Sequence, residues 1–360
     1  MPAVNILSLD GGGIRGIIPA RILAEIEKRC HRPIAKMFDL IAGTSTGGIL
    51  ALALAKPSPK RPSHPQYSAE ELIDFYLDNG PHIFEANICH KIPILHMAAD
   101  AVEPRFPIDA LEDALRQKFG DMKLSEALVE VLIPGYDLRG VDLDKTARRV
   151  VELDAGGTPV FFARWKARHD PKDFDFYARD LARATSAAPT YFEPFRIRPA
   201  RGGEWMGMID GGVFANNPAM CAYTEAIKVF GPDNQFTVVS IGTGELNEPI
   251  DTDAAQHWGE LGWVRPLLTI MMDGVSKTID HQLSTVLPYA EEAKQRYFRL
   301  QPELAKEHAE MSDASQQNME LLQTVATAYI AKHTRRLDTI CDLLQQHLPT
   351  QRRRAATAKG

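Results

Sequence analysis

Cysteine is scarce in this sequence, and the four residues present are widely separated along the chain. Cys30, Cys89, Cys221 and Cys341 form no Cys-x-x-Cys pair. This spacing argues against a disulfide framework and against a zinc site, and it fits a reducing compartment. We therefore expect a cytoplasmic protein that holds no metal and needs no cofactor.

Long hydrophobic runs are also absent, which argues against a membrane-spanning helix. The longest apolar run, Ile49–Ala55, is far shorter than the roughly 20 residues that such a helix requires. The first residues, MPAVNILSLDGGG, lack the basic segment and the small-residue cleavage site of a secretion signal. We expect a soluble protein, so that any association with the inner membrane is peripheral.

A third absence is a strong excess of one charge. Charged residues make up 24% of the chain and the formal net charge is −6, so no basic surface for nucleic acid is predicted. The 360 residues, 44% of them hydrophobic, are ample for a packed core. We expect one domain over residues 1–360, with a motif-bearing core at about 4–244, a helical part at about 262–348 and a basic tail at 351–360.

The hydrophobic pattern alternates between short buried strands and helices. Strand Val4–Leu9 precedes helix Ile18–Cys30, and strand Phe38–Ala42 precedes helix Ile49–Lys56. This order is typical of a three-layer α/β/α domain with a mostly parallel central sheet. Further strands are predicted at Val129–Tyr136, Val160–Trp165, Gly207–Ile209, Phe236–Ile241 and Arg296–Leu300, and further helices at Ala69–Asn79, Ile108–Phe119, Pro218–Phe230 and within Ser315–Leu348.

A Gly-x-Ser-x-Gly motif, GTSTG at Gly43–Gly47, lies between a predicted strand and a predicted helix. Small residues let the chain reverse sharply there, and the turn exposes the serine hydroxyl above the sheet. This context favours Ser45 as a nucleophile over an ordinary glycine-rich turn. Thr46 and Gly47 are then expected to line the site.

A second glycine-rich turn, DGGGIRG at Asp10–Gly16, also follows a strand and opens a helix. Its amides can converge on one point, which suits either an oxyanion or a phosphate. The spacing matches neither the dinucleotide-binding nor the P-loop fingerprint, so an oxyanion hole beside Ser45 is the favoured interpretation. Arg15 could brace this loop, contact a substrate phosphate or form a surface salt bridge.

Asp210 ends a predicted strand and is followed by Gly211 and Gly212. A carboxylate at the carboxyl end of a parallel strand faces the same rim as Ser45, although a turn aspartate bonded to its own backbone is the simpler alternative. None of the late histidines follows a strand in a glycine turn, and His281 is expected on a solvated helix. A Ser45–Asp210 dyad is therefore preferred, and it requires a pKa raised by partial burial of Asp210.

Three motifs in this order resemble those of the patatin-like phospholipases. They are DGGGIRG (Asp10–Gly16), GTSTG (Gly43–Gly47) and DGGVFANNP (Asp210–Pro218), and ATSAAPTYFEPF (Ala184–Phe195) resembles the segment ahead of the last one. Pro189 in that segment is expected to line the site. The resemblance implies Ser45 as nucleophile, Asp210 as base, and an oxyanion hole from the backbone of Gly11, Gly12 and Gly13.

The resemblance further implies calcium-independent hydrolysis of fatty-acyl esters in phospholipids or other lipids. A bacterial branch of the family acts in anti-phage defence and is switched on by cyclic dinucleotides, so such an activator is a hypothesis here. Whether the chain forms a homo-oligomer stays open. Candidate anion contacts, with a solvated basic face as the favoured alternative, are Arg148, Arg149, Arg164, Lys166, Arg168, Arg196, Arg198 and Arg201.

Two other functions remain compatible with the residues. One is a soluble carboxylesterase, thioesterase or acyltransferase, and the other is a non-catalytic module that binds phosphate or nucleotide through the DGGG loop. The apolar stretches Ile92–Met97 and Tyr191–Phe195 either line an acyl groove, contact a bilayer or belong to the core, and core is the favoured interpretation.

Overall fold

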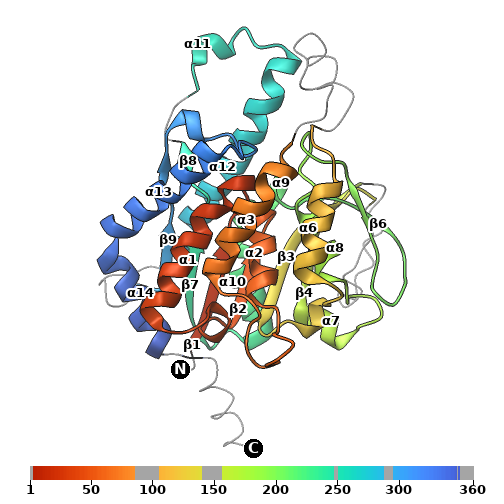
Figure 1. The fold of residues 1–360 in the computed structure, drawn as a ribbon, viewed down its shortest axis with the longest axis vertical. Helices are drawn as coiled ribbons and strands as arrows, with labels where there is room; N and C mark the ends of the chain where they lie inside the picture. The colour runs from red at the N-terminus through yellow and green to blue at the C-terminus, as the bar shows by residue number, and fades with distance from the viewer. Residues whose placement is uncertain are drawn as a thin grey trace, which may run out of the picture.

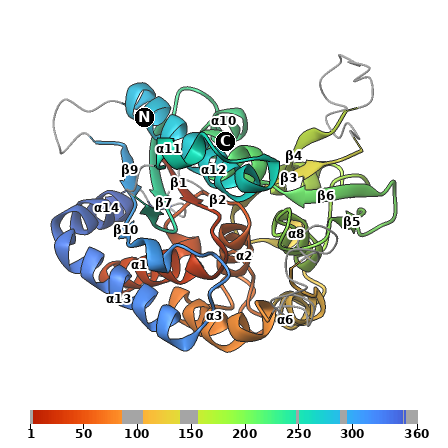
Figure 2. The same cartoon turned by 90° about the horizontal axis from the view of Figure 1, so that it is seen from above.

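The structure is a computed structural model that describes residues 3–85, 105–139, 156–246, 250–287, 295–346 and 348. The apolar stretch Ile92–Met97, Arg148, Arg149 and the basic tail lie outside these residues. The described part contains a sheet of eight strands in the order β5-β6-β3-β2-β1-β7-β9, with β4 paired to β3. Helices cover both faces of the sheet, as Figure 2 shows from above, so the predicted three-layer α/β/α fold is confirmed.

Five strands of the sheet run parallel, and they are the most deeply buried part of the chain. In β1 all seven residues are buried, and alternate side chains face opposite layers. Leu7 and Leu9 join one hydrophobic cluster, whereas Val4 and Ile6 join the other. The parallel strands are β1 (Ala3–Leu9), β2 (Leu40–Gly43), β3 (Glu130–Asp137), β7 (Gln235–Ile241) and β9 (Tyr297–Leu300).

The remaining strands give the sheet an antiparallel edge. Both β4 (Thr158–Ala163) and β6 (Met206–Asp210) pair antiparallel with β3, and β5 (Phe195–Ile197) pairs antiparallel with β6. The sheet is therefore mostly parallel, as predicted. Strand β6 is antiparallel to β3, whereas the sequence-based argument for Asp210 treated it as a parallel strand.

The two helical layers are unequal in size (Figure 1, Figure 2). The larger contains α1 (Ile17–Cys30), α2 (Thr46–Leu54), α3 (Ala69–Ile83), α6 (Asp109–Phe119), α8 (Ala178–Thr185), α13 (Gln316–Lys332) and α14 (Thr334–Gln346), and the smaller contains α10 (Ala219–Phe230) and α12 (Glu260–Val286). Short elements are α7 (Arg164–His169), α9 (Gly212–Ala215), α11 (Thr252–Ala255), the 3-10 turns Gly13–Gly16, Ile34–Lys36, Leu124–Glu126 and Lys306–His308, and a pair of short strands, β8 (Glu245–Leu246) and β10 (Glu303–Leu304).

The C-terminal elements complete the same fold. Strand β9 extends the sheet beside β7, and α13 and α14 pack against α1. One hydrophobic cluster runs from Leu7 to Leu348 and includes these helices. Packing also brings the buried free thiols of Cys30 and Cys341 close to each other, although they are far apart in sequence. No helix among the described residues has both the length and the apolarity needed to cross a bilayer.

Candidate functional site

The Ser45 turn joins β2 to α2 in a backbone conformation that L-residues rarely adopt. Ser45 has φ 55° and ψ −125°, and it precedes the first residue of α2. The turn is too tight for larger neighbours, because a Cβ on Gly43 would lie 2.0 Å from the Gly47 oxygen and one on Gly47 would lie 2.3 Å from the Leu9 oxygen. The strained turn holds the partly exposed Ser45 above the buried α2.

The hydroxyl of Thr185, at the end of α8, fixes the backbone of this turn. The Ser45 N–H donates to Thr185 Oγ1 at 3.0 Å, and the same hydroxyl donates to the Pro134 oxygen of β3 at 2.7 Å. Thr185 is fully buried, so both hydrogen bonds are shielded from water. One side chain thereby ties the Ser45 turn to the central sheet.

Asp210 reaches the same level of the sheet from the opposite direction. In the register, Ala42 of β2 pairs with Leu132 of β3, and Asp210 pairs with Gly135. Gly135 lies three residues beyond Leu132, and Ser45 lies three residues beyond Ala42. Asp210 therefore lies level with the Ser45 turn although β6 is antiparallel, because β6 pairs only with the last residues of β3, Gly135–Asp137. The argument from the carboxyl end of a parallel strand was wrong.

The Asp210 carboxylate is buried, and it lines the same cavity as Ser45. Burial raises its pKa to about 7, although hydrogen bonds from the Gly212 N–H and from the Ser45 side chain lower it in part. The Gly212 amide donates to Asp210 Oδ1 at 2.7 Å. The pKa agrees with the value near neutrality that a base in a dyad requires.

The DGGG loop places two amides beside Ser45. Gly12 and Gly13 line the cavity described below, and their N–H groups have no hydrogen-bond partner among the described residues. Gly13 has φ 59°, and a Cβ there would lie 2.2 Å from the Met311 oxygen. The Gly11 N–H, by contrast, donates to the Asn216 oxygen at 3.1 Å and is already occupied. The structure therefore supports Gly12 and Gly13, not Gly11, as free donors.

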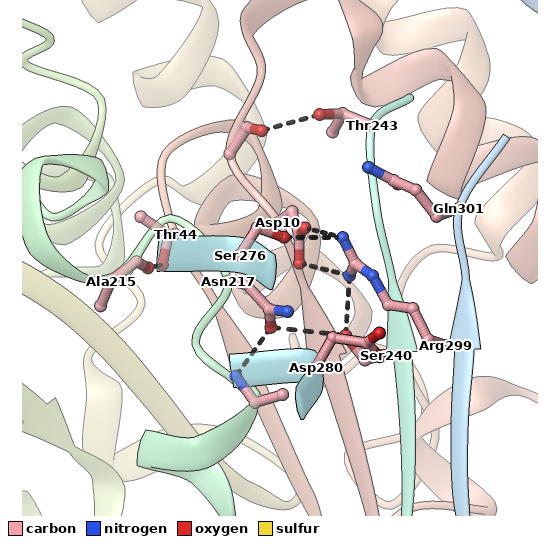
Figure 3. Close-up of polar contacts among 12 residues, drawn as sticks. Asp10, Thr44, Ala215, Asn217, Ser240, Thr243, Ser276, Asp280, Arg299 and Gln301 are labelled. Carbon is pink, nitrogen blue, oxygen red and sulfur yellow. Dashed lines mark hydrogen bonds and ion pairs between the residues drawn. The ribbon is translucent and has the colours of Figure 1, made fainter. Parts of the chain in front are cut away.

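A buried ion pair holds the base of this loop, as Figure 3 shows. Arg299 of β9 contacts both Asp10 oxygens, at 3.0 and 2.6 Å, and also bonds Ser240 of β7 and Ser276 of α12. The Thr243 hydroxyl adds a 2.7 Å hydrogen bond to the Gly11 oxygen (Figure 3). These contacts anchor the DGGG loop from the C-terminal part of the chain.

A cavity of about 580 Å³ opens beside Ser45 and Asp210, within the range typical of ligand sites. Its walls come from α2, α3, the segment after α8, α12 and the loop around Met311. Besides the dyad and the glycines, its predominantly apolar lining includes Ile49, Phe75, Tyr76, Ile83, Phe84, Leu111, Pro189, Tyr191, Phe192, Val213, Pro266, Met271 and Met272. Such a cavity suits a fatty-acyl chain.

The remaining predicted lining residues divide into two groups. Thr46, Pro189 and Gly212 do line the cavity. Gly47 and Gly211 do not, because their Cα atoms pack against the backbone of Leu9 and Pro134 and serve the tight turns instead.

Arg15 is also absent from the cavity wall. Its Nε donates to the Gly12 oxygen at 3.5 Å, and burial lowers its pKa. Of the roles considered from the sequence, the structure supports bracing of the loop.

Other sequence candidates do not enter the site. No described histidine lines the cavity, and His281 is exposed on α12 as expected. Within the described ranges no cluster of histidine, cysteine and acidic side chains is suited to a metal. Arg164 is paired with Glu130 at 2.6 Å, so this arginine is a structural partner of β3, not a free anion contact.

Three residues that help to build the site were not predicted from the sequence. Thr185 lies within the ATSAAPTYFEPF segment, but nothing in its sequence context indicates a bond to the Ser45 amide. Arg299 and Met311 come from the region after Gly262, where no motif is visible. A buried arginine on a predicted strand was the one available signal, since such a residue needs an acidic partner.

Comparison with known proteins gives sequence relatives over most of the chain. A family model described as patatin-like phospholipase matches residues 7–223. Patatin-like protein 2 of rice (Oryza sativa subsp. indica) is 30% identical over 93% of this chain and 85% of its own length. Patatin-2-Kuras 4 of potato (Solanum tuberosum) is 31% identical over 91% of this chain and 87% of its own.

Among solved structures, human GIVD cytosolic phospholipase A2 is similar at a TM-score of 0.43 and 12% identity. The match covers 96% of this chain but 60% of that one, less than two thirds of its length. A likeness at this level carries no argument, so the sequence matches alone bear on the family.

Proposed function

Because the chain belongs to the patatin-like phospholipase family, we propose that it hydrolyses fatty-acyl esters of phospholipids through a Ser45–Asp210 dyad. The observation that carries the proposal is that Ser45 and the buried Asp210 carboxylate line the same cavity, and that burial raises the pKa of Asp210 to about 7. The apolar cavity beside these two groups supports an acyl chain as the bound part of the substrate.

The first half of the reaction transfers the acyl group to the protein. Asp210 takes the Ser45 hydroxyl proton while Oγ forms a bond to the ester carbonyl carbon. The carbonyl oxygen becomes an oxyanion beside the Gly12 and Gly13 amides, and one such donor is typically worth about 3 kcal/mol. When the intermediate collapses, the carbon–oxygen bond to the alcohol breaks, and the leaving oxygen takes the proton from Asp210.

The second half releases the fatty acid. Asp210, again a carboxylate, takes a proton from water as the water oxygen attacks the acyl–serine carbonyl. Collapse of this second oxyanion breaks the bond to Ser45 Oγ, which recovers the proton from Asp210. A single carboxylate thus serves as base and acid in each half, and its near-neutral pKa suits both roles.

The test is fatty-acid release from phosphatidylcholine vesicles by wild type, Ser45→Ala and Asp210→Asn, with exposed-site controls Ser63→Ala and Asp233→Asn. We expect each dyad variant to lose at least about a thousandfold in rate, with the controls near wild type. Thermal unfolding checks that the variants fold. Substantial activity in a folded dyad variant would refute the proposal.

The same assay separates the alternative substrates. Parallel reactions with p-nitrophenyl butyrate and with palmitoyl-CoA report on a soluble carboxylesterase or thioesterase. Preference for either over vesicles would move the assignment to that class. Activation by a cyclic dinucleotide and a role in antiviral defence stay predictions from the family resemblance, and adding such a nucleotide to the vesicle assay tests the activation.

A further inference from the structure

Helix α12 changes the character of its exposed face along its length. In its first half Trp263, Leu267, Ile270 and Met271 are between 38% and 48% exposed. These four residues, which we call the α12 apolar stripe, are spaced i, i+4, i+7 and i+8 and so share one side of the helix. They account for half of the large hydrophobic side chains that are exposed in the described residues.

Further along the helix the same side is polar. About two to four turns beyond the stripe, the exposed side chains on this side are Lys277, Thr278, His281 and Thr285. Val286, 50% exposed at the end of the helix, falls on a different side. A helix that water covers throughout would keep polar residues outward in both halves. The change therefore marks the first half of α12 as a surface that is covered by something other than water.

The opposite side of α12 belongs to the site. Pro266, Thr269 and Met272 line the cavity, and further along Ser276 bonds Arg299 and Asp280 bonds the Tyr297 hydroxyl. The apolar stripe thus lies on the outside of the same helix segment that walls the cavity on its inside. Figure 1 shows this segment, with α11, at one end of the molecule's long axis, beyond the ends of the strands.

We propose that the α12 apolar stripe is the surface by which this protein docks on a lipid bilayer, next to the opening through which an acyl chain enters. This inference rests on the proposed function. Met271 is the residue that joins the two features, since it is 41% exposed and also lines the cavity. An acyl chain can therefore pass from bilayer to cavity along apolar surface, without crossing water.

Two further observations favour a bilayer over a second copy of the chain. The sequence from Pro266 to Met272 contains no charged residue, and Trp263 packs edge-on against Trp258 at 5.2 Å. Tryptophan is favoured at the boundary between water and acyl chains. A second copy seated on the stripe would, in addition, cover the cavity wall at Met271, where the substrate has to enter.

The test is flotation of the full-length protein with vesicles of phosphatidylcholine and phosphatidylglycerol in a 4:1 ratio. Leu267→Asp/Ile270→Asp changes two stripe residues that do not line the cavity. The matched control is Leu138→Asp, because Leu138 is 49% exposed, like Leu267 at 48%, but lies in the turn just after β3. All proteins carry Ser45→Ala in this experiment, so that no vesicle is degraded.

We expect the double variant to lose at least about tenfold in vesicle-bound fraction, with Leu138→Asp like the parent. When Ser45 is kept as serine, the double variant should lose vesicle hydrolysis to a similar extent. It should keep hydrolysis of dissolved p-nitrophenyl butyrate within about twofold. Unchanged flotation of the double variant, or an equal loss in Leu138→Asp, would overturn the inference.

A failure of the proposed function gives a different pattern. In that case the parent floats through the stripe, yet Ser45→Ala has no effect on ester hydrolysis. A second copy as the occupant is detected by sedimentation without lipid. A dimer that becomes monomeric in the double variant, with flotation unchanged, would contradict the bilayer proposal.

Discussion

In the proposed mechanism a single carboxylate has to accept the proton that a histidine accepts in a serine triad. An ordinary aspartate is too weak a base for this task at neutral pH. Asp210 is 4% exposed, and loss of water raises its pKa to about 7 despite hydrogen bonds that favour the charged form. Burial of this one residue is therefore the physical basis of the proposed dyad.

The rate should depend on pH through this group. Asp210 acts as a base only when it is deprotonated, so kcat/KM for a dissolved ester is expected to rise tenfold per pH unit below about pH 7 and to level off above it. A pH–rate profile from pH 5 to 9 measures this. A flat profile over that range would exclude Asp210 as the titrating base.

The same deprotonation that should raise the rate should lower the stability of the folded state. The folded-state pKa exceeds the unfolded value of 3.8, so the folded state retains the proton longer, and stability from this group is lost as the pH rises from about 4 to about 7. Asp210→Asn, which is neutral at every pH, should unfold at a higher temperature than wild type at pH 8. The gain in free energy of unfolding should be at most on the order of 4 kcal/mol. The advantage should vanish near pH 3.

Thr185 offers a second single-residue test, since its hydroxyl bonds both the Ser45 amide and the Pro134 oxygen. Thr185→Val keeps the shape but leaves two buried groups unpaired, which costs roughly 1–3 kcal/mol for each group. We expect a lower melting temperature and a kcat reduced about tenfold or more. Thr185→Ser retains the hydroxyl and should recover most of both. Equal kcat in the valine and serine variants would show that the hydroxyl does not position Ser45.

Secondary-structure elements were predicted well where the hydrophobic pattern is local. Strand β1 and helices α1 and α10 begin and end within about one residue of their predicted bounds. Helix α8 was missed, because ARDLARAT has a short amphipathic pattern without a capping signal. The direction of β6 was missed too, since periodicity does not distinguish parallel from antiparallel pairing.

The junction between β9 and the DGGG loop is the element-level contact that sequence reasoning could not find. Arg299 and Asp10 are 11% and 2% exposed and lie at opposite ends of the sequence. Arg299→Met would leave a buried carboxylate without its partner, which typically costs about 3–5 kcal/mol. Thermal denaturation should show this loss, whereas Arg296→Met, on a partly exposed neighbour, should cost about 1 kcal/mol or less.

A second substitution separates charge from packing at this junction. Asp10→Asn added to Arg299→Met removes the unpaired charge and should restore part of the stability. No recovery in the double variant would show that the Arg299 contacts matter through packing and the bonds to Ser240 and Ser276.

The candidate site could be predicted only in part, because some of its contacts depend on how the whole chain folds. Ser45, Asp210 and the glycines sit in short motifs whose turn chemistry is visible in sequence. The free and occupied amides of the DGGG loop were not distinguishable, because Gly11 donates to Asn216, a partner about 200 positions away in the chain. The cavity walls from α12 and Met311 likewise depend on how the C-terminal elements close over the sheet.

Covalent labelling by a fluorophosphonate, followed by peptide mapping of the full-length protein, identifies the nucleophile directly. We expect one adduct, on the Ser45 hydroxyl, formed slowly or not at all in Asp210→Asn, because the nucleophile then lacks its base. An adduct on a different residue, or undiminished labelling of Ser45 in folded Asp210→Asn, would contradict the proposed dyad.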